Sequence, residues 1–192
     1  MQDGTTPAEL HAKAFALYAR GQNWDQRSAW YAQADECVAS GGEPDRRDGM
    51  KWPAKWALEI CNYENFWREH GRRPRENTRD RATLLAGESR LGVWATYQRR
   101  FERGLCRYQR IRLDISPAFV WDPHESDWQD TLDGCIEDVQ KKGHLPDLNP
   151  ADPEEFARAR WFRRQLRHLQ TGSLSQSRAE RFAALLKLAK TA

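Results

Sequence analysis

The chain reads Trp-Ala-Thr-Tyr-Gln-Arg-Arg at residues 94–100 and Trp-Phe-Arg-Arg-Gln-Leu-Arg at residues 161–167. Both stretches follow the same earlier pattern, in which a Trp lies fifteen residues before a Gly and a Pro comes three residues after that Gly. This earlier pattern is formed by Trp56, Gly71 and Pro74 in the first copy and by Trp128, Gly143 and Pro146 in the second. Recurrence after about seventy residues indicates two copies of one small structural unit.

Apolar residues in both copies recur with the period of an amphipathic helix. In segment 53–70 the spacing is i, i+4, i+7 and i+11, and Gly71 stands where a left-handed C-cap would end the helix. No stretch is a clear candidate for a strand. We expect three helices in each copy, at 53–70, 88–103 and 107–115 in the first and at 126–142, 153–171 and 175–190 in the second. In the helix over 88–103 the expected inner stripe consists of Leu91, Trp94, Ala95, Gln98 and Phe101.

A helical hairpin is expected before the first copy. Thr6-Pro7-Ala8-Glu9 combines an N-cap, a proline at the first helical position and a capping-box Glu. A second helix is expected over 25–40, and the polar segment 43–51 is predicted to be a linker. The hairpin is either an addition to the repeat or a decayed third copy, because Gly41 and Pro44 keep the Gly–Pro spacing although no Trp stands fifteen residues before that Gly.

The predicted fold is therefore all-α, with two tandem three-helix bundles preceded by a helical hairpin. We place the hairpin at 1–50, the first bundle at 53–122 and the second at 124–192. The composition fits small domains with aromatic anchors. Only 39% of residues are hydrophobic, 31% are charged and the mean hydropathy is −0.92, but the chain contains nine Trp.

Neither membrane association nor export is expected. No stretch approaches 18 uncharged apolar residues, and the first residues lack the basic region and apolar core of a signal peptide. We therefore expect a cytoplasmic protein. Its isolated cysteines are expected to be reduced core residues, not disulfides or metal ligands. They are Cys37, Cys61, Cys106 and Cys135.

The sign of the charge changes along the chain, although the net charge is only +3. Basic minus acidic residues come to −3 for 1–67, +8 for 68–112, −10 for 113–156 and +8 for 157–192. Positive charge is thus concentrated in the second half of each copy.

Arginines form the most specific candidate site. In the second copy four of them fall at i, i+3, i+4 and i+7, along one side of a helix and with no acid among them. The candidates are Arg160, Arg163, Arg164 and Arg167 in the second copy, and Arg99, Arg100, Arg103 and Arg107 in the first. Like charges on one face repel each other, and an anionic partner such as phosphate, which suits the planar guanidinium, relieves that repulsion. The alternative is a solvated face, or ion pairs with the acidic residues 113–156.

The first copy resembles the helicase-associated domain. The residues that carry the resemblance are Trp56, His70-Gly71-x-x-Pro74, Leu91-Gly92-x-Trp94-x-x-x-Gln98-Arg99 and Gly104-Leu105. The resemblance extends over about residues 55–190. It implies small three-helix bundles presumed to bind nucleic acid, which occur in tandem at the C-termini of some bacterial helicases and in proteins without a motor. The second copy departs from this pattern at Gly143-His144, at Leu166 in place of Arg99, and at Leu188-Ala189 in place of a closing Trp.

Glutamine and tryptophan side chains are the remaining candidates. Gln98 and its counterpart Gln165 are expected either to satisfy a buried loop group or, beside the arginines, to contact adenine edges. Tryptophans at helical spacing are expected in the cores, namely Trp56, Trp94, Trp128 and Trp161. Tryptophans near helix ends or loops are expected to be partly exposed and are candidates for stacking on bases, namely Trp24, Trp30, Trp52 and Trp121.

Catalytic motifs find no support in the sequence. There is no glycine-rich phosphate loop and no nucleophile motif, and His124-Glu125 has no second ligand at metal spacing. We expect no catalytic residue, no metal and no cofactor. The sequence predicts a DNA-binding accessory or regulatory protein, with RNA as the second candidate ligand. The alternative is a protein-interaction adaptor or self-associating module that acts through the acidic residues 113–156.

Overall fold

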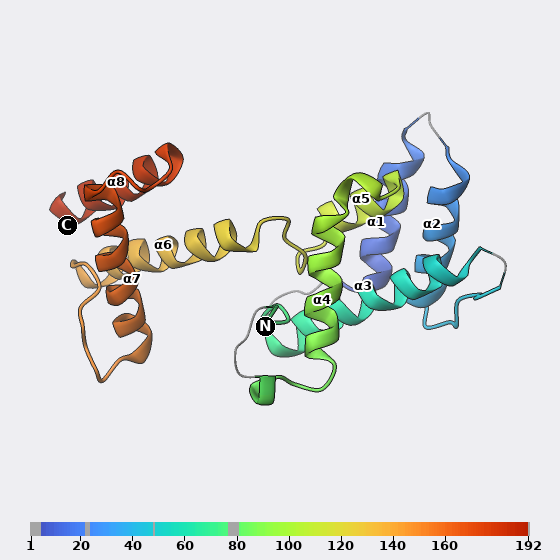
Figure 1. Cartoon of the computed structure of the whole chain (residues 1–192), viewed down its shortest axis with the longest axis horizontal. Helices are drawn as coiled ribbons and strands as arrows, with labels where there is room; N and C mark the ends of the chain where they lie inside the picture. Colours follow the sequence, from blue (N-terminus) through green and yellow to red (C-terminus); the bar gives the residue numbers. More distant parts are fainter. Residues whose placement is uncertain (1–4, 22–23, 48, 77–80, 192) are drawn as a thin grey trace. The chain divides into compact units, whose positions relative to one another are not determined.

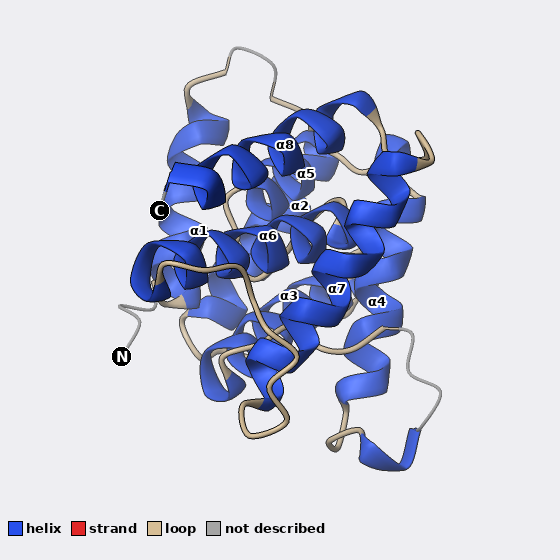
Figure 2. Cartoon of the chain, turned by 90° about the vertical axis from the view of Figure 1, so that its left-hand side faces the viewer, coloured by secondary structure: helices blue, strands red, loops and turns tan. Residues whose placement is uncertain are grey.

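The computed structural model describes residues 5–21, 24–47, 49–76 and 81–191, and in these ranges the chain forms helices and no strand (Figure 2). The prediction of an all-α fold is therefore confirmed. The chain divides into two compact units, residues 1–121 and residues 122–192. Each unit has its own hydrophobic core.

Unit 1 contains both the hairpin and the first copy of the repeat (Figure 1). Its α-helices are α1 (Pro7–Ala19), α2 (Gln26–Ala39), α3 (Lys51–His70), α4 (Glu88–Arg100) and α5 (Arg107–Asp114), with 3-10 turns at Arg81–Thr83 and Glu102–Gly104. Helix α2 packs on α1, α3 and α5, α5 also packs on α1, and α4 packs on α3. The hairpin that we predicted as a domain over 1–50 is thus an integral part of unit 1.

Local side-chain signals set the helix ends. At the start of α1, Glu9 N–H donates to Thr6 Oγ1 over 3.3 Å, and Thr6 N–H donates to the Glu9 carboxylate over 2.7 Å. This is the capping box expected from the sequence. Helix α2 begins where Asp25 accepts a hydrogen bond from Ser28 N–H at 2.7 Å. Gly71 ends α3 with a φ of 64°, a conformation that favours glycine.

A buried charge cluster joins the hairpin to the repeat. Arg112 on α5 is completely buried and donates two hydrogen bonds to the Glu64 carboxylate on α3, at 2.6 and 2.8 Å. Its Nε donates to Asp35 on α2 at 2.9 Å, and the Tyr108 hydroxyl donates to the same carboxylate at 2.6 Å. Burial opposes the charge of Arg112, but the hydrogen bonds to Glu64 and the charge of Asp35 outweigh burial and raise the pKa of the guanidinium. Three helices therefore meet on one buried cation.

Unit 2 consists of α6 (Pro123–Lys142), α7 (Pro153–Gln170) and α8 (Gln176–Thr191), as Figure 1 shows. Helix α6 packs on both α7 and α8. The core of this unit is small and built around one Trp and two Phe, with the buried residues Trp128, Leu132, Cys135, Val139, Phe162, Phe182 and Leu185. Because one face of α7 supplies core residues, its opposite face is turned to solvent.

A Trp–Gln hydrogen bond recurs in both units and aligns the two copies residue by residue. This alignment is called the register of the Trp–Gln pairs below. Trp56 Nε1 donates to Gln98 Oε1 at 3.1 Å in unit 1, and Trp128 Nε1 donates to Gln165 Oε1 at 3.0 Å in unit 2. Both glutamines are buried. The indole N–H of each large anchor is thereby satisfied inside an otherwise apolar core.

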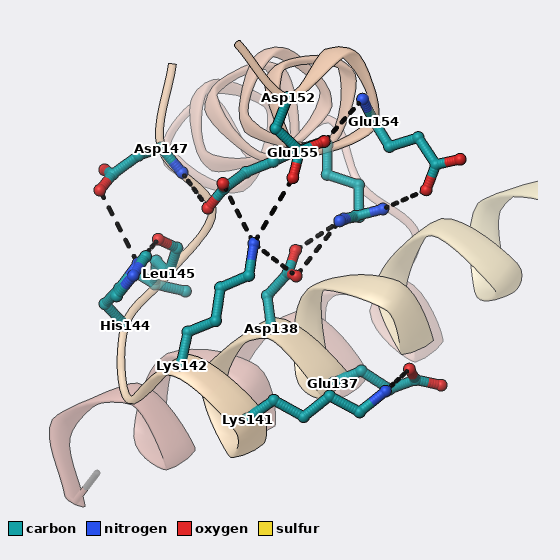
Figure 3. A network of polar contacts seen from close by, with 11 residues as sticks. Glu137, Asp138, Lys141, Lys142, His144, Leu145, Asp147, Asp152, Glu154 and Glu155 are labelled. Carbon is teal, nitrogen blue, oxygen red and sulfur yellow. Dashed lines mark hydrogen bonds and ion pairs between the residues drawn. The ribbon is translucent and has the colours of Figure 1, made fainter. Parts of the chain in front are cut away.

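In each copy a buried Glu in the first turn of the second helix accepts a hydrogen bond from the loop that follows Gly71 or Gly143. Glu88 accepts the Arg75 backbone N–H at 2.9 Å, and Glu155 accepts the Asp147 backbone N–H at 3.4 Å. In unit 2 the Lys142 Nζ lies 3.0 Å from Glu155 and 3.4 Å from Asp138 (Figure 3). The second helix of each copy is therefore anchored at its first turn, which determines the face that it exposes.

Candidate nucleic-acid interface

The solvent face of α7 carries the four arginines predicted from the second copy. Arg160, Arg163, Arg164 and Arg167 are all exposed. The opposite side of the helix is buried through Ala159, Phe162 and Gln165. At 3.6 residues per turn and 1.5 Å per residue, the four positions cover an arc of roughly 100° and a length of roughly 10 Å. The structure therefore places all four on one continuous cationic strip, called the α7 ridge below.

Within the described residues, no side chain of the α7 ridge forms an ion pair or a hydrogen bond. Several acidic residues of unit 2 form ion pairs with other cations. Asp138 pairs with Arg158 at 2.6 Å, and Glu125 pairs with both Arg178 and Arg181. In unit 2, internal pairing with the acidic segment, one of the alternatives open at the sequence level, thus involves cations outside the α7 ridge.

The first-copy arginines do not form an equivalent ridge. Arg99 is largely buried, pairs with Glu76, and donates to the Val120 carbonyl at 2.8 Å. Arg107 lies over the Tyr18 ring at 5.6 Å. Helix α4 ends at Arg100, three residues earlier than we expected, and the 3-10 turn that follows interrupts the helical period. Positions 99, 100, 103 and 107 therefore do not share one helical face.

Two of the first-copy arginines, Arg100 and Arg103, are exposed. Gln98, which we had retained as a candidate for base contact, is 4% exposed, and its side-chain carbonyl accepts the hydrogen bond from Trp56. Burial of Gln98 therefore favours the structural alternative, in which its side chain satisfies a buried polar group. Arg99, which is largely buried, is part of the packing of α4 on the segment before Trp121. Arg100 and Arg103 are therefore the two first-copy arginine candidates that are exposed to solvent.

Two aromatic side chains near the end of α4 were missed by the sequence reasoning. Phe101 was expected on the inner side of the helix but is 46% exposed, and Tyr97 is 57% exposed. The signal that reveals Tyr97 is the register of the Trp–Gln pairs, which aligns it with Arg164 of the α7 ridge, whereas Phe101 aligns with His168, outside the α7 ridge. A residue at a ridge position faces solvent in both copies.

The tryptophans divide much as expected. Trp56 and Trp128 are buried, and Trp94 and Trp161 are partly buried beside them. Trp24 and Trp52 are 60% and 66% exposed. Trp30 and Trp121 are only partly exposed. Trp24 packs edge-on against Tyr18 with ring centroids 4.9 Å apart, which ties it to the hairpin core.

The described residues contain no cluster of three or more His, Cys, Asp or Glu side chains that could hold a metal ion. Nor is any helix among them long and apolar enough to cross a membrane. All four cysteines are free, and burial raises the pKa of Cys135 to about 12, so its thiol stays protonated at neutral pH. The candidate side chains exposed at the surface are arginines and aromatic residues, which form charged and aromatic contacts.

Comparison of the chain with known proteins found no match among protein-family models, curated proteins or solved structures.

Proposed function

We propose that this chain is a nucleic-acid-binding protein and that the α7 ridge contacts the phosphate backbone of DNA. The observation that carries the proposal is the α7 ridge itself, with four exposed arginines that have no partner within the described residues, in a unit where Arg158, Arg178 and Arg181 are paired. Arginine holds phosphate oxygens through a planar fork of donors, and neutralised phosphates release counterions.

The dimensions of the α7 ridge suit a backbone. Measured along the duplex axis, its length of roughly 10 Å corresponds to about three nucleotides of one strand, at about 3.4 Å per nucleotide. Contacts of this kind set affinity and position without reading sequence. We therefore propose general affinity for the duplex from unit 2, with an accessory or regulatory role for the whole chain and no catalysis.

We also propose that α3 to α5 and α6 to α8 are two copies of one three-helix module, in keeping with the resemblance to the helicase-associated domain. Support comes from the equivalent Trp56–Gln98 and Trp128–Gln165 hydrogen bonds and from the two buried Glu side chains at the start of α4 and α7. The proposal for the α7 ridge rests on its own geometry and does not require the family assignment.

A second candidate function is self-association. Helix α6 exposes Asp127, Asp130, Asp133 and Glu137, and this acidic face offers a surface for the α7 ridge of another copy. None of these acids is free, since Glu137 pairs with Lys141 at 2.7 Å, Asp133 accepts from Gln129 at 2.7 Å, and Asp127 and Asp130 also have partners. Phosphate is therefore the better match to the α7 ridge.

Binding of a fluorescein-labelled DNA duplex of about 20 base pairs at low salt tests the proposal. The variant replaces the four arginines of the α7 ridge with Gln. A matched control replaces four exposed cations of unit 1 with Gln, at Lys13, Arg20, Arg46 and Lys51, and so loses the same charge. We expect the ridge variant to bind at least about tenfold more weakly and the control to bind nearly as the native chain. Equal losses in both variants, or a native chain that forms oligomers and does not bind, would exclude a specific role for the α7 ridge.

A further inference from the structure

Helix α4 presents an apolar stripe to solvent. Val93, Tyr97 and Phe101 follow one another at four-residue spacing and are 65%, 57% and 46% exposed. The inner side of α4 is formed by other residues, among them Leu91 and Ala95, which are buried. The stripe therefore contributes little to the core of unit 1, and the rings remain in contact with water.

The two rings form one aromatic surface bordered by cations. Tyr97 and Phe101 have their ring centroids 4.4 Å apart at an interplanar angle of 40°. The Arg100 guanidinium lies 5.7 Å from the Phe101 centroid, and Arg103 is exposed in the next turn. Arg27 also reaches this end of the helix, where it donates to the Gly104 carbonyl at 2.8 Å.

The described acidic residues at this surface are already paired. Glu102 pairs with Arg110, and Glu76 pairs with Arg99 and accepts from the Thr96 hydroxyl at 2.7 Å. The local charge around the rings is therefore positive. A ligand that offers flat apolar rings together with negative charge complements such a surface.

The same helix face differs between the two units. The register of the Trp–Gln pairs aligns Val93 with Arg160, Thr96 with Arg163, Tyr97 with Arg164 and Arg100 with Arg167. Four cations in unit 2 are thus replaced in unit 1 by one cation, one hydroxyl, one aliphatic group and one ring, and a second ring follows at Phe101. In a duplex the faces of the bases are covered by stacking, so exposed rings gain a partner only from unpaired bases.

On the basis of the proposed function, we propose that Tyr97 and Phe101 are a stacking platform for unpaired bases of single-stranded nucleic acid. Arg100 and Arg103 neutralise the phosphates that flank the stacked bases. Unit 1 then binds single strands and unit 2 binds backbone phosphates. A nucleic acid with a duplex and a single-stranded tail offers a ligand to each unit.

The test compares a fluorescein-labelled oligodeoxythymidine of about 20 nucleotides with the labelled duplex, using the full chain. The variant is Tyr97→Leu with Phe101→Leu, which keeps apolar bulk but removes the aromatic faces. The matched control is Phe15→Leu, because Phe15 on α1 is 41% exposed, close to the 46% of Phe101, and belongs to neither proposed surface. A second variant, Tyr97→Trp with Phe101→Trp, restores larger aromatic faces. All these side chains are exposed, so the thermal midpoint should change little.

We expect the double Leu variant to bind the single strand at least about tenfold more weakly, the double Trp variant to bind it as tightly as the native chain, and duplex affinity to stay unchanged in both. Unchanged single-strand affinity in the Leu variant overturns the platform but leaves the proposed function intact, provided that the ridge variant loses duplex binding. Equal loss in the Phe15 control also overturns it. Absence of any nucleic-acid binding by the native chain overturns both proposals, and a change of oligomeric state in the Leu variant assigns the stripe to protein contact instead.

Discussion

Replacement of Arg112 by Met should destabilise unit 1 more than any change to an exposed arginine. The guanidinium is completely buried and donates three hydrogen bonds to two buried carboxylates, those of Asp35 and Glu64. Removal of one partner from a buried ion pair costs about 3–5 kcal/mol, because the remaining charge is left unpaired. A domain of this size has about 5–15 kcal/mol of stability in total, so the loss should lower the thermal midpoint by roughly 10–20 °C.

The control is Arg110→Met on the same helix. Arg110 is about half exposed and pairs with Glu102 and Asp114, so its loss should cost less than about 1 kcal/mol. Urea unfolding followed by circular dichroism measures both variants. A further variant that combines Arg112→Met with Asp35→Asn and Glu64→Gln removes the stranded charges and should recover part of the stability. Equal effects of the changes at 112 and 110 would refute the claim that this cluster joins the hairpin to the repeat.

Two further predictions concern the loop between α3 and α4. The ion pair with Arg72 is the main reason why the pKa of Glu88 lies well below its usual value, so the stability that Glu88 provides is fully present above about pH 4.5 and is lost as the pH falls toward the lowered pKa. Glu88→Gln should therefore cost about 1–3 kcal/mol at pH 7 and less at pH 3, and a difference between native and variant that does not change with pH contradicts this. Gly92→Ala should destabilise unit 1 by about 1–3 kcal/mol because a Cβ there would meet the Arg75 carbonyl oxygen at 2.6 Å, whereas Gly104→Ala, with open space around it, should leave the unfolding free energy unchanged or raise it by up to about 1 kcal/mol.

The parts of the fold that the sequence predicted depend on local signals. The capping box at Thr6 and the left-handed Gly71 act within one turn of the chain, so the ends of α1 and α3 could be placed to within two residues. Trp56 and Trp128 were recognised as equivalent because each lies fifteen residues before a Gly, and Gln98 and Gln165 because each lies four residues after a Trp. The structure joins the Trp and Gln of each copy by a hydrogen bond. The α7 ridge was also predictable, because four residues of one helix keep their relative directions whatever lies around them.

The parts that were missed depend on contacts between residues far apart in the sequence. The hairpin joins unit 1 through Asp35, which meets Arg112 seventy-seven positions later, and no local pattern signals that pairing. Arg99 was assigned to a cationic ridge but is held by Glu76 and by the Val120 carbonyl. Phe101 was assigned to the core because the helix was expected to continue, whereas it ends at Arg100. Local charge and hydrophobicity do not distinguish a largely buried arginine such as Arg99 from an exposed one, or an exposed aromatic such as Phe101 from a buried one.

The salt dependence of duplex binding measures most directly whether the α7 ridge neutralises phosphates. The dissociation constant is determined from about 50 to 200 mM salt for the native chain, for the ridge variant and for the control variant of unit 1. Each lost phosphate contact lowers the slope of the logarithm of affinity against the logarithm of salt concentration by about 0.9, so loss of about three contacts should reduce it by roughly 3 in the ridge variant and leave the control unchanged. A slope that is the same in the native chain and in the ridge variant would contradict the account, because the four arginines of α7 would then contact no phosphate.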